Sequence, residues 1–181
     1  MLNSEESVVF KNILCPTDGS DHANKALTLA VDLAGKYDAS LLLVHVLLRN
    51  VDARELKRFA EVEGLTKSVA SEVDRLMEVD SRVEIVRLRD LQTISTGVLV
   101  DIGEHMLGLA KLEAENSGVR DVSVTVLDGD PAERILEHAE RENADCIVMG
   151  SRGLSDVKGL VLGSVSHKVS NRATCTCITV K

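Results

Sequence analysis

The 181-residue sequence is 44% hydrophobic, enough for a packed core, and we expect a single domain over residues 1–181. Its formal net charge is −8, its basic residues are dispersed and only 2% of its residues are aromatic, which argues against a nucleic-acid-binding face. No apolar run approaches the about 18 residues that a membrane span needs. Residues 1–6 are acidic, unlike a signal peptide, so we expect a cytoplasmic protein without membrane insertion.

The first part of the chain alternates between strand and helix patterns. An apolar run at residues 8–15 predicts a strand that ends at the turn residues around Pro16. Apolar residues at helical spacing predict a helix over about 20–36, closed by Gly35. Residues 40–48 are apolar almost throughout, which is typical of a strand buried on both faces of a parallel sheet.

Residues 50–96 form an extended connection that the sequence defines poorly. Residues 51–77 are rich in charge and carry apolar residues at helical spacing, whereas residues 81–91 alternate like a short strand or an extended loop. A clearer helix pattern spans about 97–116 and stops at Asn116-Ser117-Gly118.

The C-terminal part returns to regular alternation. A strand is expected over residues 119–127, and Asp130-Pro131 then opens a helix to about residue 143, with Asp130 as N-cap and Glu133 placed to reach back. The last three elements are expected as strand, helix and strand, over residues 145–150, 164–171 and 175–180. Because crossovers between parallel strands are right-handed, this order predicts an α/β fold with a doubly wound parallel sheet.

A glycine-rich loop is the sharpest candidate for a binding site. Gly150-Ser151-Arg152-Gly153 follows a predicted strand, and after nine residues Gly163-Ser164-Val165-Ser166 opens a predicted helix. Such a junction presents unpaired backbone N–H groups at the positive end of a helix dipole, where phosphate binds. Glycine allows a close backbone approach, and the two serines add hydroxyl donors. The loop is neither a Walker A nor a GxGxxG motif, and a purely structural loop remains an alternative.

Pro16-Thr17-Asp18 follows the first predicted strand. If the first and fourth strands are neighbours at a switch point, Asp18 faces the glycine loop across the crevice. Asp18 is then either a turn or cap residue or a contact to ribose, adenine or metal. The four cysteines lack metal-ligand spacing and are expected as small buried residues, and His45 as a hydrogen-bonded structural histidine.

Three segments together resemble the universal stress protein family. They are Lys11–Ser20, Leu43–Val46 and the ending from Ile147 to Val180, which matches the family's G-x-x-G-x9-G-[ST] nucleotide motif. The resemblance covers about residues 9–48 and 119–181, whereas residues 50–96 are longer than the family's usual connection. It implies a Rossmann-like, adenine-nucleotide alpha-hydrolase-like fold with a five-stranded parallel sheet of order 3-2-1-4-5.

The resemblance also implies an ATP site with Mg²⁺ and a homodimer formed through the C-terminal edge strand. Carried over by position, it places the adenosine end near Asp18 and the backbone of Val46, the ribose near Met149, and the phosphates on the glycine loop. Ser166 stands where many members have Thr. The expected nucleotide-binding residues are Pro16, Thr17, Asp18, Val46, Met149, Gly150, Arg152, Gly153, Gly163, Ser164, Val165 and Ser166.

No catalytic base or metal cluster stands out in the sequence. The histidines define no metal site, and no Ser-His-Asp or Cys-His arrangement can be argued, so the metal ligands are not identified. Arg152, Lys158 and Lys168 could neutralise phosphate charge or be ordinary surface residues. We therefore expect an ATP-binding stress-response regulator. The alternatives are a slow ATPase or phosphotransferase, and an interaction module that does not use nucleotide.

Overall fold

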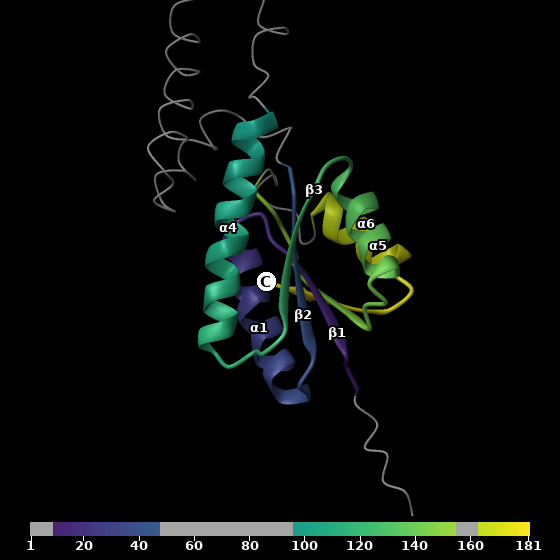
Figure 1. The fold of residues 1–181 in the computed structure, drawn as a ribbon. Helices are drawn as coiled ribbons and strands as arrows, with labels where there is room; N and C mark the ends of the chain where they lie inside the picture. Colours follow the sequence, from purple (N-terminus) through teal and green to yellow (C-terminus); the bar gives the residue numbers. More distant parts are fainter. Residues whose placement is uncertain (1–8, 48–95, 155–162) are drawn as a thin grey trace, which may run out of the picture.

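The computed structural model describes residues 9–47, 96–154 and 163–181 (Figure 1). Their elements in chain order are β1 (Asn12–Pro16), α1 (Asp21–Tyr37), β2 (Ser40–Val46), α4 (Thr96–Asn116), β3 (Val122–Leu127), α5 (Pro131–Arg141), β4 (Cys146–Gly150), α6 (Ser164–Arg172) and β5 (Thr176–Val180). The five strands are parallel and lie in the order β3-β2-β1-β4-β5. The predicted α/β fold and strand order are thus confirmed.

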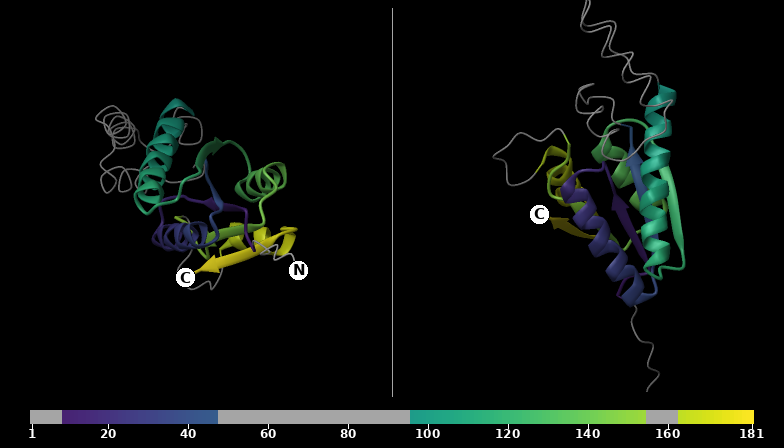
Figure 2. Two further views of the ribbon diagram at one scale, coloured as in Figure 1. Left: turned by 60° about the horizontal axis from the view of Figure 1, so that its bottom comes forward. Right: turned by 90° about the vertical axis from the view of Figure 1, so that its left-hand side faces the viewer.

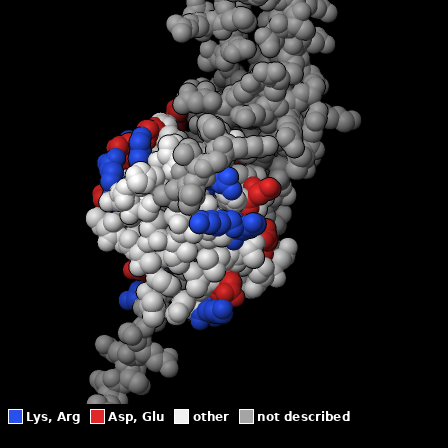
Figure 3. All heavy atoms as spheres, turned by 180° about the vertical axis from the view of Figure 1, so that it is seen from behind, with Lys and Arg blue, Asp and Glu red and all other residues white. Residues whose placement is uncertain are grey.

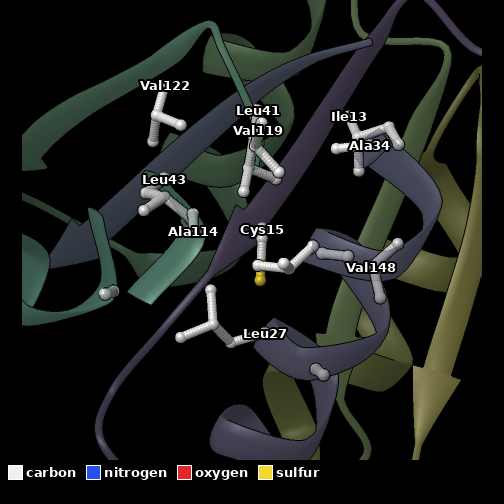
Figure 4. Close-up of a cluster of buried hydrophobic side chains, with 14 of the residues drawn as sticks. Ile13, Cys15, Leu27, Ala34, Leu41, Leu43, Ala114, Val119, Val122 and Val148 are labelled. Carbon is white, nitrogen blue, oxygen red and sulfur yellow. The ribbon is translucent and has the colours of Figure 1, made fainter. Parts of the chain in front are cut away.

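The sheet is covered on both faces. Helices α1 and α4 pack on one face and α5 and α6 on the other, as Figures 1 and 2 show. Because side chains alternate along a strand, neighbouring residues of β1 enter different layers. Ile13 and Cys15 join the cluster with α1 and α4 (Figure 4), whereas Leu14 joins the cluster with α5. The central strands are therefore buried on both sides, as the unbroken apolar runs predicted.

Three predicted boundaries were wrong. Gly35 does not close α1, which continues to Tyr37 and ends at Asp38, a residue with φ of 53° whose N–H bonds to the Ala34 carbonyl. Asp tolerates this left-handed conformation better than most residues, so it can serve as the cap. Strand β1 begins at Asn12 rather than near residue 8, and the Asp145 carboxylate accepts the amides of Lys11 and Asn12 at this point, at 2.7 and 2.9 Å. Strand β3 begins at Val122 rather than at residue 119.

The start of α5 follows the expected capping pattern in part. The Asp130 side chain accepts the Glu133 amide at 3.1 Å, with Pro131 in the first turn. The Glu133 carboxylate accepts from Arg172 of α6 at 2.6 Å instead of reaching back to the N-cap. A second pair, Lys168 and Asp130 at 3.6 Å, lies beside it, so α6 is tied to the first turn of α5.

Several sequence-based expectations lie outside the described residues. The predictions for residues 50–95 are among them, as are the end of the strand expected at 40–48 and Lys158 in the glycine loop. In the part of the chain that is described, no helix has the length and apolar character needed to cross a membrane. All four cysteines are free. Cys15 and Cys146 are buried in their strands, as expected, whereas Cys175 and Cys177 near the edge of the sheet are only partly buried, so that expectation was wrong for them.

Candidate functional site

The candidate site lies at the carboxyl ends of β1 and β4. These strands are neighbours, with Leu14 in register with Ile147. From here the chain crosses over to β2 on one side and to β5 on the other, which makes this the switch point of the sheet. A parallel sheet of this order, with a pocket at its switch point, is typical of the Rossmann-like class of α/β proteins.

One pocket at this edge brings together every residue that the sequence predicted for the site. Its lining includes residues from the turn after β1, the end of β2, the end of β4 and the start of α6. The lining residues are Pro16, Thr17, Asp18, Val44, Val46, Pro131, Ile135, Met149, Gly150, Arg152, Gly153, Leu154, Gly163, Ser164, Val165 and Ser166. Their roles toward a ligand stay a prediction.

Sequence reasoning missed four lining residues. Val44 lies two positions before Val46 and so shares its face of β2. Pro131 and Ile135 come from the first turns of α5, because the chain leaving the carboxyl end of β3 returns over the same edge of the sheet. The Asp130-Pro131 helix start was a usable signal for these two. Leu154 carried no such signal.

The first turn of α6 presents backbone donors to the pocket. Its N-cap is Gly163, which has no side chain to cap the helix, and the first helical bond runs from the His167 amide to the Gly163 carbonyl at 2.9 Å. The amides of Ser164, Val165 and Ser166 precede that bond, so the helix itself gives them no acceptor. They lie at the positive end of the α6 dipole, where an anion is stabilised.

The two serines of this turn differ in their surroundings. The Ser166 hydroxyl is buried and donates to the carbonyls of Ser151 at 2.7 Å and Gly163 at 3.1 Å. The Ser151 carbonyl also accepts the Gly163 amide at 2.7 Å, so these contacts close the base of the glycine loop. The Ser166 hydroxyl was expected to donate to phosphate, but its proton is engaged by the backbone. The exposed Ser164 keeps its hydroxyl at the surface of the pocket.

Asp18 faces the glycine loop, as expected from the neighbouring strands. One carboxylate oxygen accepts the Ser20 amide at 3.0 Å, and the other accepts the Leu154 amide at 3.0 Å. The N-cap of α1 is Ser20, whose side chain accepts the Ala23 amide. Asp18 is therefore a turn residue that also anchors the chain after β4, and both of its oxygens already accept backbone amides.

The glycine of β4 meets a different need from the one expected. A Cβ on Gly150 would lie 2.8 Å from the carbonyl carbon of His22 and 2.9 Å from the amide of Ala23. Both are backbone atoms of the first turn of α1, so a side chain here would push α1 away from β4. The missing side chain lets α1 approach the strand closely.

The basic side chains of the site are partly engaged. The Arg152 guanidinium contacts Nε2 of His22 at 3.3 Å, and the Ser20 hydroxyl donates to the Arg152 carbonyl at 3.4 Å. Lys168 is paired with Asp130 and does not line the pocket. On the face seen in Figure 3, basic side chains lie beside acidic ones and do not gather into one patch. Since the chain also carries a net charge of −8, an anion in the pocket would depend on local amides more than on the overall field.

His45 is a buried, hydrogen-bonded histidine, as expected. Its Nδ1 lies 2.9 Å from the carbonyl oxygen of Thr17, and its side chain is 1% exposed. Burial lowers the pKa of His45, although the bond to Thr17 and the charge of Asp18 act in the opposite direction. The imidazole is therefore neutral at pH 7 and donates from Nδ1 to the carbonyl.

The chain matches the universal stress protein family over residues 10–181. The universal stress protein YxiE of Bacillus subtilis (strain 168) is 34% identical over 173 residues, which cover 96% of this chain and 100% of the relative. This chain therefore belongs to the universal stress protein family.

Solved structures of family members share the fold. A universal stress protein in complex with cAMP has a TM-score of 0.56 and 20% identity, over 94% of this chain and 96% of that chain. The universal stress protein from Archaeoglobus fulgidus in complex with dAMP has a TM-score of 0.58 and 17% identity, over 96% of this chain and 99% of that chain. At these identities the likeness concerns the fold.

Proposed function

We propose that this protein binds an adenine nucleotide, ATP with Mg²⁺, in the pocket at the switch point and acts in stress response through its nucleotide-dependent state. The observation that carries the proposal is the first turn of α6. The helix begins with three successive amides, those of Ser164, Val165 and Ser166, and its N-cap residue Gly163 has no side chain that could accept a bond from them. They line the same pocket as Asp18 and Val46. A polyphosphate is an anion of matching chemistry.

The other end of the pocket suits a flat apolar ring. Val46 is 9% exposed and Met149 5%, and Pro131 and Ile135 line the same pocket from α5. Together they supply much of the apolar part of the lining, against which a planar ring can pack. The cAMP and dAMP complexes of family members support adenine as the base.

The cation is expected to be held mainly by the nucleotide. Among the described residues, no group of three His, Cys, Asp or Glu side chains could hold a metal ion. Mg²⁺ commonly keeps several waters and binds through phosphate oxygens, and it does not need a cage of protein ligands. Mg²⁺ would also neutralise part of the negative charge of the polyphosphate, which a chain with a net charge of −8 does not balance.

The described site favours binding over turnover. Within the described lining, Asp18 is the only carboxylate, and both its oxygens accept backbone amides. The buried Ser166 hydroxyl is likewise engaged, at 2.7 Å from the Ser151 carbonyl. Phosphoryl transfer usually needs a base or a water-positioning residue at the phosphates, and these two described candidates already serve bonds within the protein. We therefore propose a nucleotide-binding regulator and expect any hydrolysis to be slow.

A substitution at the first residue of α6 tests the anion site directly. Ser164→Pro removes one amide, and proline is favoured at this helical position. The preceding Gly163, with φ of −75° and ψ of 163°, already has the backbone that proline requires before it. The matched control Ser164→Ala removes only the hydroxyl.

By isothermal titration calorimetry with ATP and Mg²⁺, we expect binding by the wild type and a loss of about tenfold or more in Ser164→Pro, since the amide bonds a charged group. Ser164→Ala should lose less affinity for ATP than Ser164→Pro does. Absence of binding by the wild type, or equal affinity in Ser164→Pro, contradicts the proposal.

We further propose that two chains associate through β5. This strand is at the edge of the sheet. The Val180 carbonyl accepts the Ser151 amide, so the backbone groups of Val180 face β4. Because backbone groups alternate in direction along a strand, the Thr179 amide points away from β4. Thr179→Pro should therefore remove an outward donor and leave the sheet intact. Sedimentation should show a wild-type dimer and a weakened dimer in Thr179→Pro. A wild-type monomer at micromolar concentration contradicts this proposal.

The four free cysteines support a reducing compartment, and we propose that the protein acts in the cytoplasm. Fluorescence microscopy of a tagged full-length chain, compared with fractionation of the untagged protein, tests this placement. Signal confined to a membrane or secreted fraction contradicts it.

A further inference from the structure

The turn that begins the pocket is held by two consecutive residues of β2. The Thr17 amide donates to the Val44 carbonyl at 2.9 Å, which continues the pairing of β1 with β2 one residue past the end of β1. In a regular parallel ladder, the carbonyl of Thr17 would then accept the amide of Val46, two residues further along β2. Here the His45 side chain takes that carbonyl, with Nδ1 at 2.9 Å.

We propose that His45 is a positioning residue that holds the Thr17 carbonyl directed toward its own imidazole, out of line with the ladder, and so leaves the Val46 amide available to the base of a bound nucleotide. This inference rests on the proposed function and assigns a role to a side chain outside the pocket lining. Val46 itself lines the pocket, so an amide released from the ladder can donate to an acceptor atom on the ring edge.

The opposite layer of the protein fixes the orientation of the imidazole. A Cβ on Gly103 of α4 would lie 2.7 Å from Cδ2 of His45 and 3.4 Å from a methyl group of Val126. The ring is thus enclosed by the α4 backbone and by β3, and its side chain is 1% exposed. This close packing favours the observed rotamer, in which Nδ1 is directed at Thr17.

The bond also couples His45 to the glycine loop. Thr17 precedes Asp18, whose carboxylate accepts the Leu154 amide at 3.0 Å. A shift of the Thr17 carbonyl would therefore move both the adenosine side of the pocket and the anchor of the chain after β4. The α6 amides are held by other contacts, among them the Gly163 amide to the Ser151 carbonyl at 2.7 Å.

The chemistry of asparagine provides a matched test. Asn Nδ2 is bonded to Cγ, as His Nδ1 is, so His45→Asn can still donate to Thr17. His45→Gln places its donor one bond further out, and His45→Leu has no donor. A role in positioning predicts rescue by Asn alone, whereas a role in filling space predicts that Leu and Gln serve at least as well.

Two probes separate the adenosine end from the phosphate end: AMP and inorganic triphosphate with Mg²⁺, both titrated into the full chain by calorimetry. His45→Leu and His45→Gln should lose about tenfold in AMP affinity, the effect of one hydrogen bond, with triphosphate affinity unchanged. His45→Asn should stay close to the wild type for both. Equal AMP affinity in all variants, or equal loss in Asn and Leu, overturns the proposal.

Hydrogen exchange of the Val46 amide in the nucleotide-free protein tests the role without any ligand. In the wild type this amide should exchange much faster than that of Val44, and His45→Leu should slow it at least about tenfold as Val46 takes the Thr17 carbonyl. A slowly exchanging Val46 in the wild type overturns the proposal. If the wild type binds neither probe but its Val46 amide exchanges as expected, the proposed function fails and the positioning by His45 stands.

Discussion

The Cβ position of Gly153 lies 2.5 Å from Oδ2 of Asp18, so a side chain at residue 153 and the observed carboxylate cannot occupy the site together. The same oxygen accepts the Leu154 amide at 3.0 Å. A glycine at residue 153 is therefore needed by the neighbouring carboxylate, independently of any ligand. This relationship makes a specific prediction about how the two residues are coupled.

Gly153→Ala should displace the Asp18 carboxylate, release the Leu154 amide and weaken ATP binding by about tenfold or more. In Asp18→Ala the obstructing oxygen is gone, so adding Gly153→Ala to it should cost little more. Contacting residues commonly show a coupling of about 0.5–3 kcal/mol in such a cycle. Calorimetry on the four proteins measures it, and strictly additive losses would show that the contact is unimportant.

Gly150→Ala should destabilise the fold. Its Cβ would meet two backbone atoms of α1 at 2.8 and 2.9 Å, and overpacking of this kind costs about 1–3 kcal/mol. Gly35→Ala is the matched control, because nothing lies within 4 Å of its added Cβ inside α1. The control should gain about 0.5–1 kcal/mol. Urea unfolding distinguishes the two, and equal stabilities in both variants would refute the packing argument.

The two serines of α6 should separate stability from binding. Ser166→Ala removes the buried bond to the Ser151 carbonyl at 2.7 Å and should lower the free energy of unfolding by about 1 kcal/mol. Ser164→Ala should leave stability unchanged within about 0.5 kcal/mol and weaken ATP binding severalfold. Urea unfolding and calorimetry on both variants test this assignment, which the reverse pattern would contradict.

Stability should fall on acidification partly through His45. Burial, the largest effect, lowers the pKa of His45 from 6.5 in the folded protein, against the opposing effects of the Thr17 carbonyl and Asp18. The unfolded chain therefore takes up this proton first as the pH falls below 6.5, and stability is lost from there down to the folded pKa.

His138, whose pKa is lowered by burial and by Arg141, contributes in the same direction. His45→Asn should remove only the His45 share. Unfolding free energies at pH about 7.5 and about 5.5 give the slope for each protein. A slope in His45→Asn as steep as in the wild type would contradict the role of His45.

The strand and helix patterns predicted a doubly wound parallel sheet with the glycine loop at its carboxyl edge. The resemblance to the universal stress protein family implied the strand order, which is confirmed, and the twelve candidate residues, all of which line the pocket. The sequence also predicted the Asp130 N-cap, which depends on a local pattern. Pro131 and Ile135 were missed because the Asp130-Pro131 pattern indicates where α5 starts, whereas their place at the pocket also depends on how α5 returns over the sheet.

Other features depend on contacts between distant segments. The Gly150 and Gly153 positions lie against α1 and Asp18, more than a hundred residues away in sequence, so their motif spacing indicated a ligand where packing also acts. The Ser166 hydroxyl was assigned to phosphate because a sequence does not show that Ser151 turns its carbonyl toward it. Gly35 was read as a helix end, but Asp38 supplies the left-handed cap.

The backbone amides of Ser164, Val165 and Ser166 can be followed individually by NMR in a ¹⁵N-labelled full-length chain during titration with ATP and Mg²⁺. If these three N–H groups hold the polyphosphate, their resonances should shift together and among the most in the protein, saturating with the calorimetric affinity. Two results would contradict an anion site at the start of α6. In the first, these resonances stay in place although calorimetry shows that ATP binds. In the second, they stay in place because ATP does not bind even at concentrations of several millimolar.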